Sequence, residues 1–368
     1  MKKIGVVGAG TMGLGIAQSF ATAGNKVELV DPYTRPEDKL KSTLSSLVSK
    51  GKISEEKSES IITSIKFSKE LSSLAECEVV IEAVVEDIKV KHSVFSEIEK
   101  VVQKDTLLAS NTSSLSIASI SAGVEKKDRV IGFHFFNPAP VMKLVEIVPG
   151  FLTSAESIEK AKTIVTSIGK EFVIAKDAPG FIVNRVARPF YGEALRILEE
   201  HLASIADIDA SMKEVGFKMG PFELMDLIGL DVNYAVTKSV FEGFYYDPRY
   251  KPSLIQKSYV EAGYLGKKTG QGFYDYSKEI PKGKPNKEVS DRILAMLINE
   301  AADALYLKIA TKEDIDKAMK LGANYPKGLL EWGEEIGLGT VATIIDSLHQ
   351  RYKEDRYRAS QYLRSFQS

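Results

Sequence analysis

The glycine-rich segment Gly8-Ala9-Gly10-Thr11-Met12-Gly13 constrains the fold of this chain more than any other feature. It directly follows the apolar run 3–7 and opens a helical pattern. In a strand–turn–helix unit, the first glycine permits the tight turn, the second lets a pyrophosphate approach the backbone, and the third lets helix and strand pack closely. Amides at the helix N-terminus then face the phosphates. The segment predicts a dinucleotide site formed by Gly8, Gly10, Thr11, Met12 and Gly13.

An acidic residue accompanies the glycine motif at the expected distance. Asp31 ends the next β-branched run after Gly8, where a carboxylate can accept hydrogen bonds from the adenosine ribose. The same charge would repel a 2′-phosphate, so NAD is favoured over NADP as the cofactor. Arg35 lies close by in the sequence and is the one feature that favours NADP.

The distribution of strand-like and helical patterns predicts the fold class. Short β-branched runs alternate with helical patterns up to about residue 178, which is typical of a parallel sheet with helices on its faces. We expect an α/β chain: an N-terminal Rossmann-type doubly wound sheet domain over residues 1–178, followed by two mainly α-helical repeat domains. The strand-like runs are 3–7, 26–30, 78–85, 106–109, 130–136, 143–148 and 172–175.

The helical part contains an internal repeat with a constant offset between its copies. Glu193 recurs as Glu300, and Arg249-Tyr250 recurs at the same offset as Arg356-Tyr357. The offset is too long for a solenoid, whose repeats span about 20 to 50 residues. We therefore expect two copies of one helical unit, at 179–276 and 287–368, of which the second lacks an equivalent of Gly266-Lys267-Lys268-Thr269-Gly270.

Composition and charge exclude several classes of protein. The 368 residues include 49 Lys and Arg against 50 Asp and Glu, a net charge of -1, which disfavours a general nucleic-acid binder. The one cysteine, Cys77, cannot form an intramolecular disulfide, and no Cys/His cluster has the spacing of a zinc site. No stretch reaches the roughly 18 apolar residues of a membrane span. We expect a soluble, cytoplasmic protein without a metal, nucleic-acid or membrane partner.

Polar side chains follow two of the predicted strands. The segment Ser110-Asn111-Thr112-Ser113-Ser114 could orient a carbonyl or a nicotinamide at the carboxyl end of a strand, although such a segment also suits a loop or a helix cap. His134 ends another strand, between Phe133 and Phe135. The other histidines, His92, His201 and His349, lie in polar or charged stretches.

Glu146 is a candidate partner of His134. It lies further along the chain, within the apolar run 144–148, where a carboxylate needs a partner to offset its desolvation. Paired with His134, it would fix the tautomer and stabilise the imidazolium that forms when the imidazole removes a proton. The spacing leaves two interpretations open: a general base, or a core histidine with satisfied hydrogen bonds.

At these residues the chain resembles the 3-hydroxyacyl-CoA dehydrogenase family. The number and order of the matching motifs make the resemblance more specific than any one of them. The motifs are Gly8–Gly13, Glu82–Glu86, Ser110–Leu115, His134–Pro138, Lys143–Glu146, Asp177–Arg185, Gly220–Asp226 and Gly266–Gly270.

The resemblance implies reversible, NAD-dependent oxidation of (S)-3-hydroxyacyl-CoA to 3-oxoacyl-CoA, in fatty-acid β-oxidation or short-chain 3-hydroxybutyryl-CoA metabolism. It implies that His134 is the general base and that Glu146 orients it. It also implies that Ser113 and Asn184 hold substrate oxygen atoms and that Ser113 touches the cofactor. The remaining matched positions are cofactor contacts at Asp31, Glu86, Lys91, Asn137 and Lys268, and a contact with the CoA phosphates at Lys50, for which Lys52 is a competitor.

Two other features bear on the substrate. A lysine cluster, Lys39, Lys41, Lys50 and Lys52, could bind the CoA phosphates or could be a solvated helix face. Dehydrogenases of free β-hydroxyacids usually place a catalytic lysine four residues before an asparagine, and Gly180 takes that place before Asn184. The missing lysine counts against a dehydrogenase of free hydroxy acids. The alternatives are an NAD-dependent dehydrogenase of a sugar acid or free hydroxy acid, or a non-catalytic NAD-binding sensor.

The repeat also suggests how the chain assembles. In short members of the family the helical domain forms the dimer interface. We expect residues 287–368 to pack on 179–276 as such a partner would, which gives either a monomer with an internal pseudo-dimer of helical repeats or a homodimer.

Overall fold

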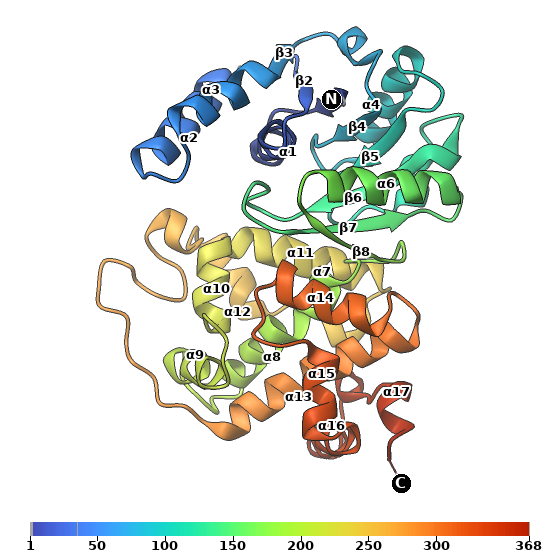
Figure 1. Ribbon diagram of the computed structural model, residues 1–368. Helices are drawn as coiled ribbons and strands as arrows, with labels where there is room; N and C mark the ends of the chain where they lie inside the picture. The colour runs from blue at the N-terminus through green and yellow to red at the C-terminus, as the bar shows by residue number, and fades with distance from the viewer. Residues whose placement is uncertain (1–2, 35, 368) are drawn as a thin grey trace. The chain divides into compact units, whose positions relative to one another are not determined.

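The computed structural model describes residues 3–34 and 36–367 (Figure 1). The chain divides into two compact parts, the first ending at Asp177 and the second beginning at Ala178. The first part contains a sheet and the second is helical.

Eight strands form one sheet within the described residues, in the order β3-β2-β1-β4-β5-β6-β7-β8. Neighbouring strands are parallel except for the antiparallel pair β6 and β7. The strands are β1 (Lys3–Val7), β2 (Lys26–Val30), β3 (Ile65–Ser68), β4 (Val79–Glu82), β5 (Leu107–Ser110), β6 (Val130–Phe135), β7 (Leu144–Pro149) and β8 (Glu171–Ile174).

The predicted Rossmann-type sheet is confirmed, with two differences. Strand β3 was not predicted, because its four residues alternate polar and apolar side chains too briefly to give a pattern, and it pairs only with β2 at the sheet edge. Strands β6 and β7 run antiparallel, whereas the other neighbouring strands are parallel, as the sequence pattern indicates. Only residues 136–143 connect these strands, which is shorter than the dozen or more residues of a parallel crossover.

Helices cover both faces of this sheet. Side chains of α1 and α6 join one face in a common core. On the other face, Ile117 of α5 packs against Gly132 in β6. The helices of this part are α1 (Thr11–Thr22), α2 (Glu37–Ser49), α3 (Glu55–Ser64), α4 (Ile88–Val101), α5 (Ile117–Ser121) and α6 (Ala155–Ser167), with 3-10 turns η1 (Leu71–Leu74) and η2 (Lys127–Arg129).

The second part is built around α13, which contacts α8, α9, α15, α16 and α17 (Figure 1). Most of its side chains are buried. The helices are α7 (Val183–Val186), α8 (Arg188–Glu199), α9 (Ile205–Glu214), α10 (Pro221–Ile228), α11 (Leu230–Gly243), α12 (Leu254–Glu261), α13 (Lys287–Tyr306), α14 (Lys312–Gly322), α15 (Leu329–Ile336), α16 (Leu338–Tyr352) and α17 (Gln361–Arg364), with η3 (Pro248–Tyr250), η4 (Lys267–Thr269) and η5 (Asp355–Tyr357).

The internal repeat corresponds to a reciprocal contact between its two copies. Arg185 of the first copy donates to Glu300 of the second, with 2.7 Å between Nε and Oε1. Arg292, the equivalent of Arg185 in the second copy, donates to Glu193, the equivalent of Glu300 in the first, also at 2.7 Å. Such exchange of equivalent contacts is the pattern of a two-fold symmetric interface. The prediction that residues 287–368 pack on 179–276 is therefore confirmed.

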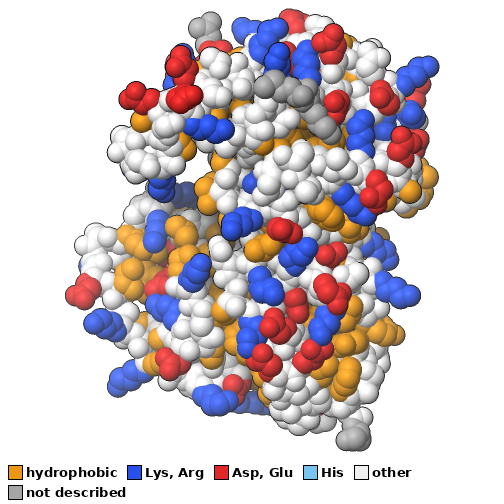
Figure 2. All heavy atoms as spheres, viewed as in Figure 1, with side chains coloured by type: hydrophobic (Ala, Val, Ile, Leu, Met, Phe, Trp, Pro, Cys, Tyr) orange, Lys and Arg blue, Asp and Glu red, His pale blue; other side chains and the backbone are white. Residues whose placement is uncertain are grey.

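Both predicted helical domains lie in the same compact part. The long helix α13 of the second copy packs on α8 of the first, so the two copies share one core. Their division into separate domains stays a prediction. None of the helices among the described residues is long and apolar enough to cross a lipid bilayer. Figure 2 shows basic and acidic side chains interspersed over the face in view.

Candidate active site

The turn between β1 and α1 has the backbone that the glycine motif requires. Gly8 has a φ of 98°, and a Cβ there would lie 2.6 Å from the carbonyl oxygen of Ala83. A Cβ on Gly13 would lie 1.8 Å from the carbonyl oxygen of Gly8, so α1 packs directly on the turn. Gly10, by contrast, faces open space and caps α1 without a side-chain hydrogen bond. The turn therefore leaves helix amides available to phosphate groups.

Asp31 lies beside this turn at the end of β2. Its carboxylate accepts hydrogen bonds from the backbone N–H groups of Ala9, at 2.8 Å, and of Tyr33 and Thr34, at 2.8 and 3.0 Å. Partial burial acts to raise the pKa of Asp31, but these hydrogen bonds outweigh it and lower the pKa. The carboxylate is therefore charged at neutral pH and fixed in place.

A hollow of about 250 Å³ adjoins Asp31. Two carboxylates, Asp31 and Glu37, and one cation, Lys69, line it. Phe67 and Ser68 of strand β3 form part of its wall. The sequence did not predict this part of the wall, because it did not predict β3. Arg35 lies outside the described residues. The lining residues are Leu29, Asp31, Thr34, Pro36, Glu37, Phe67, Ser68 and Lys69.

The predicted CoA lysines lie on α2 and on the turn after it. Lys50 and Lys52 are exposed, and both remain predictions as CoA contacts. Lys39 points elsewhere, because its Nζ lies 3.5 Å from Thr11 Oγ1 in the first turn of α1. The lysines of the cluster therefore do not all lie together: Lys39 reaches the start of α1, whereas Lys50 and Lys52 lie after the end of α2.

Glu82, the last residue of β4, connects this strand to α4 and to the end of β5. It is wholly buried and accepts hydrogen bonds from Lys91 Nζ, at 2.7 and 2.9 Å, and from Ser110 Oγ at 2.6 Å. Glu86 lies 3.2 Å from the same ammonium group and accepts a hydrogen bond from the Ser113 N–H at 3.1 Å. Burial acts to raise the pKa of Glu86, but Lys91 and neighbouring hydroxyl groups outweigh it and lower the pKa. Lys91, expected as a cofactor contact, is therefore enclosed between two carboxylates.

His134 and Glu146 face one another across β6 and β7. The two residues are opposite in the antiparallel register, and His134 Nδ1 lies 2.5 Å from Glu146 Oε2. His134 is 6% exposed and Glu146 is fully buried. The imidazole also packs on Phe136, with 4.5 Å between ring centroids. Both expectations about their proximity and burial are met, and the role of the pair in catalysis remains a prediction.

Asn111 ties the loop after β5 to the strand that carries His134. Its Oδ1 accepts a hydrogen bond from the Phe135 N–H at 3.0 Å, so it fixes the backbone next to the imidazole. Asn137 follows two residues later and is exposed. The sequence placed Asn111 in a segment that could orient a carbonyl or a nicotinamide, and it quoted Glu82 within a motif without a function of its own. A carboxylate in an apolar strand, the signal that identified Glu146, would also have found Glu82.

The two remaining predicted site residues lie in the helical part. Asn184 is on α7 and half-buried. Lys268 is on η4, and its Nζ lies 2.5 and 2.7 Å from the carboxylate oxygens of Asp231. The segment that carries Lys268 is held by Asp226, which accepts hydrogen bonds from the N–H groups of Phe273 and Tyr274, both at 3.0 Å.

Comparison with known proteins identifies the family. The model of the 3-hydroxyacyl-CoA dehydrogenase NAD binding domain matches residues 3–178, and the model of the 3-hydroxyacyl-CoA dehydrogenase C-terminal domain matches 180–276 and 289–367. The chain belongs to the 3-hydroxyacyl-CoA dehydrogenase family. This dehydrogenase is accordingly an NAD-dependent oxidoreductase.

Relatives of this dehydrogenase fall into two sizes. The 3-hydroxyadipyl-CoA dehydrogenase of Escherichia coli K12 is 37% identical over 99% of this chain and 97% of its own length. The 3-hydroxybutyryl-CoA dehydrogenase of Clostridioides difficile is 40% identical over 75% of this chain and 100% of its own length. The crystal structure of a 3-hydroxybutyryl-CoA dehydrogenase from E. coli K12 matches with a TM-score of 0.94 and 36% identity, over 100% of this chain and 98% of that chain.

Proposed function

We propose that this dehydrogenase reversibly oxidises (S)-3-hydroxyacyl-CoA to 3-oxoacyl-CoA, in fatty-acid β-oxidation or short-chain 3-hydroxybutyryl-CoA metabolism. The observation that carries the proposal is the buried His134–Glu146 pair within an NAD-binding domain. Since Cys77 is buried and unpaired in any disulfide, a cytoplasmic location is part of the proposal.

His134 acts as the general base. Hydride departure from a secondary alcohol becomes easy as the hydroxyl proton leaves, so a base at the reacting oxygen lowers the barrier. Glu146 holds Nδ1, so Nε2 is the nitrogen that takes the proton, and the charge of Glu146 stabilises the imidazolium. Ser113 and Asn184 hold substrate oxygen atoms. Bound NAD supplies the hydride acceptor.

The proposed cofactor-binding residues are those that the family resemblance implies, and the conformation of the Gly8–Gly13 turn supports the first of them. The turn at Gly8–Gly13 holds the pyrophosphate and Asp31 holds the adenosine ribose. Glu86 and Lys91 contact the bound cofactor, and Glu86 also accepts a hydrogen bond from the Ser113 N–H. The cofactor contacts further along the chain are Asn137 and Lys268.

The partner of this chain is an acyl-CoA whose CoA phosphates meet Lys50 or Lys52. The relatives differ in the acyl group that their names give. An adipyl group ends in a carboxylate, whereas a butyryl group ends in a methyl group. The acyl group of the substrate is thus the open part of the proposal.

The proposal predicts NADH oxidation with acetoacetyl-CoA, followed at 340 nm. We expect turnover with NADH and a kcat/KM at least about tenfold lower with NADPH, because Asp31 would face the 2′-phosphate and like charges repel. Free acetoacetate should give no comparable rate. Turnover of free acids alone would indicate a sugar-acid or hydroxy-acid dehydrogenase, and NADH binding without turnover of any of these would indicate a sensor.

We also propose that the second helical copy takes the place of a dimer partner, so that the chain is a monomer with an internal pseudo-dimer. The reciprocal ion pairs between the copies support this. The alternative is a homodimer formed through another surface.

A chain that ends after Lys278 tests this arrangement, because it loses α13 to α17 and exposes the face that they cover. Relatives whose whole length matches 75% of this chain indicate that such a chain can fold. Light scattering should show more self-association for the shortened chain than for the full chain. Equal oligomeric states would contradict the proposal.

A further inference from the structure

Arg188, the first residue of α8, is a buried cation for which the described part of the chain provides no carboxylate partner. It is 6% exposed. Its Nε donates to the carbonyl oxygen of Asn184 at 2.7 Å, and its Nη1 donates to Thr237 Oγ1 at 3.1 Å. The guanidinium carbon lies 5.0 Å from the centroid of the Tyr191 ring. Among the described residues, the groups that act electrostatically on Arg188 are Tyr191 and Tyr325, and neither is an acid.

The other buried arginines of the helical part differ from Arg188 in this respect. Arg185 and Arg249 both pair with Glu300, while Arg196 and Arg292 both pair with Glu193. A buried charge is costly unless an opposite charge compensates it. Burial accordingly lowers the pKa of Arg188 below its ordinary value. The charge of Arg188 is therefore uncompensated, whereas Arg185 and Arg196 on either side of it in the sequence have carboxylate partners.

The guanidinium of Arg188 also has N–H groups that the contacts above do not use. It carries five N–H groups, of which the described contacts use those on Nε and one on Nη1. Nη2 has no hydrogen-bond partner among the described residues, and the residue as a whole is 6% exposed. Nη1 and Nη2 can present two parallel N–H groups to an anion.

The position of Arg188 relates this cation to the substrate. It lies four residues after Asn184 and is bonded to that residue's carbonyl oxygen. Asn184 is on α7 and Arg188 begins α8, and Ala187 between the two helices has a helical backbone conformation. The two side chains are therefore about one helical turn apart. In a six-carbon acyl chain, three carbon–carbon bonds separate C3 from the terminal carbon, an extended span of about 4 Å. If Asn184 holds an oxygen near C3, the end of such a chain comes within reach of Arg188.

We propose that Arg188 binds a carboxylate at the far end of the acyl chain, so that the preferred substrates are 3-hydroxyacyl-CoA thioesters of dicarboxylic acids of about six carbons. The inference rests on the proposed function, because it uses the assignment of Asn184 to the substrate. Arginine suits this role since its planar fork matches a carboxylate in a bidentate arrangement. Thr237, whose hydroxyl donates to the carbonyl of Asn233 at 3.0 Å and accepts from Nη1, holds the fork in place.

The test compares two substrates that differ only at the end of the chain: 3-hydroxyadipyl-CoA and 3-hydroxyhexanoyl-CoA. The measured quantity is the ratio of their kcat/KM values with NAD, from initial rates at 340 nm. For the full-length protein we expect a ratio of at least about ten in favour of the dicarboxylic substrate, carried mainly by KM. Arg188→Met should bring the ratio to about one or below it, and Arg188→Lys should give an intermediate ratio, since a point charge lacks the bidentate geometry.

Matched variants separate this role from a structural one. Lys238→Met removes an exposed cation one residue after Thr237 and should leave the ratio unchanged. If Arg188→Met does not fold, Thr237→Val and Arg188→Lys serve as the test. Both should lower the ratio of kcat/KM for the dicarboxylic substrate to that for 3-hydroxyhexanoyl-CoA. A ratio near one for the unaltered protein, or a high ratio that persists in the Arg188 variants, would overturn the inference while the proposed function stands. If neither of these thioesters nor 3-hydroxybutyryl-CoA is oxidised, the proposed function is overturned instead.

Discussion

Replacing His134 with alanine is expected to lower kcat for 3-hydroxyacyl-CoA oxidation by at least about a hundredfold, because a positioned general base contributes about 10²–10⁴-fold. The imidazole is buried beside Glu146 and Phe136, and water that entered the space left by the side chain would be a much weaker base. Initial rates at saturating NAD measure the effect. NADH binding, followed by its fluorescence, should persist in the variant because the Gly8–Gly13 turn and Asp31 are untouched.

His201→Ala is the matched control, since His201 is exposed in the helical part and should keep full activity. Glu146→Gln should give a smaller loss than His134→Ala, because the amide keeps a hydrogen-bonding oxygen but cannot compensate the imidazolium charge. If His134→Ala retained more than about a tenth of the activity, the base would have to be another group.

Local patterns were sufficient to predict most of the sheet. Seven strands were recognised because buried parallel strands are continuous β-branched runs, and the glycine motif placed the first helix. Strand β3 was not predicted, because an edge strand of four residues needs few apolar side chains and gives no clear pattern. The direction of β7 depends on the length of a connection, which a search for apolar runs does not weigh.

The candidate site was predicted where one residue type in an unusual setting carried the signal. His134 and Glu146 were paired because each is polar within an apolar strand. Lys91 shows the limit of this reasoning, since its burial between Glu82 and Glu86 depends on how the loop between β4 and α4 folds back in three dimensions. Arg188 was not singled out for a similar reason: the lack of a partner is a property of the whole neighbourhood.

The repeat was visible in the sequence, but its energetic role was not. Glu193 and Glu300 were recognised as equivalent residues, as were Arg249 and Arg356. The sequence could not show that Arg185 pairs across the copies with Glu300, because equal spacing is compatible with contacts inside each copy or between them. Two-fold packing around α13 selects the second arrangement.

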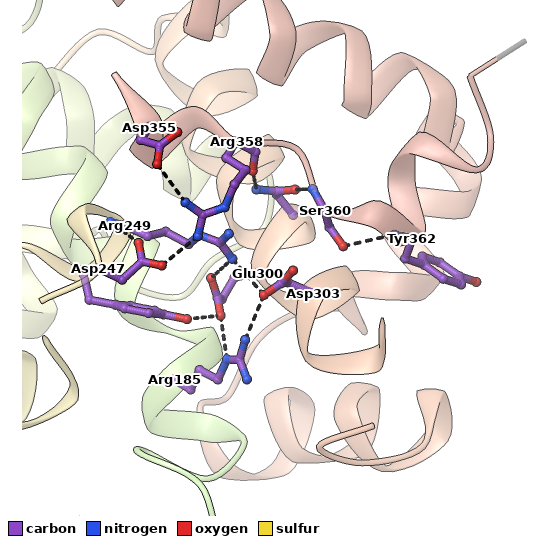
Figure 3. A network of polar contacts seen from close by, with 11 residues as sticks. Arg185, Asp247, Arg249, Glu300, Asp303, Asp355, Arg358, Ser360 and Tyr362 are labelled. Carbon is purple, nitrogen blue, oxygen red and sulfur yellow. Dashed lines mark hydrogen bonds and ion pairs between the residues drawn. The ribbon is translucent and has the colours of Figure 1, made fainter. Parts of the chain in front are cut away.

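Glu300→Ala is expected to lower the free energy of unfolding of the helical part by up to about 3–5 kcal/mol, because it removes the fully buried carboxylate that Arg185 and Arg249 share. Glu300 is fully buried and accepts hydrogen bonds from Arg185, Arg249 and Tyr250 at 2.7, 3.2 and 2.5 Å. Figure 3 shows both arginines directed at Glu300 and Asp303. Asp303 remains for both arginines in the variant, at 3.0 and 2.9 Å, which limits the loss.

The pH dependence of stability gives a second readout of the same carboxylate. Burial acts to raise the pKa of Glu300, but Arg185 and Arg249 outweigh it and hold the pKa below its ordinary value. A lowered folded-state pKa means that the stabilisation is present above the unfolded-state pKa and is lost as the pH falls through the folded-state value. The stability difference between the unaltered protein and Glu300→Ala should therefore be full at neutral pH and shrink under acid conditions.

Urea unfolding followed by the fluorescence of Trp332, the single tryptophan, measures both effects within the helical part. Glu193→Ala should cost a similar amount, because Glu193 receives the equivalent hydrogen bonds from Arg292 and Tyr357, both at 2.7 Å. Glu261→Ala removes an exposed partner of Lys257 and should change stability by less than about 1 kcal/mol. A loss for Glu300→Ala no larger than for Glu261→Ala would show that the cross-copy ion pairs do not hold the two repeats together.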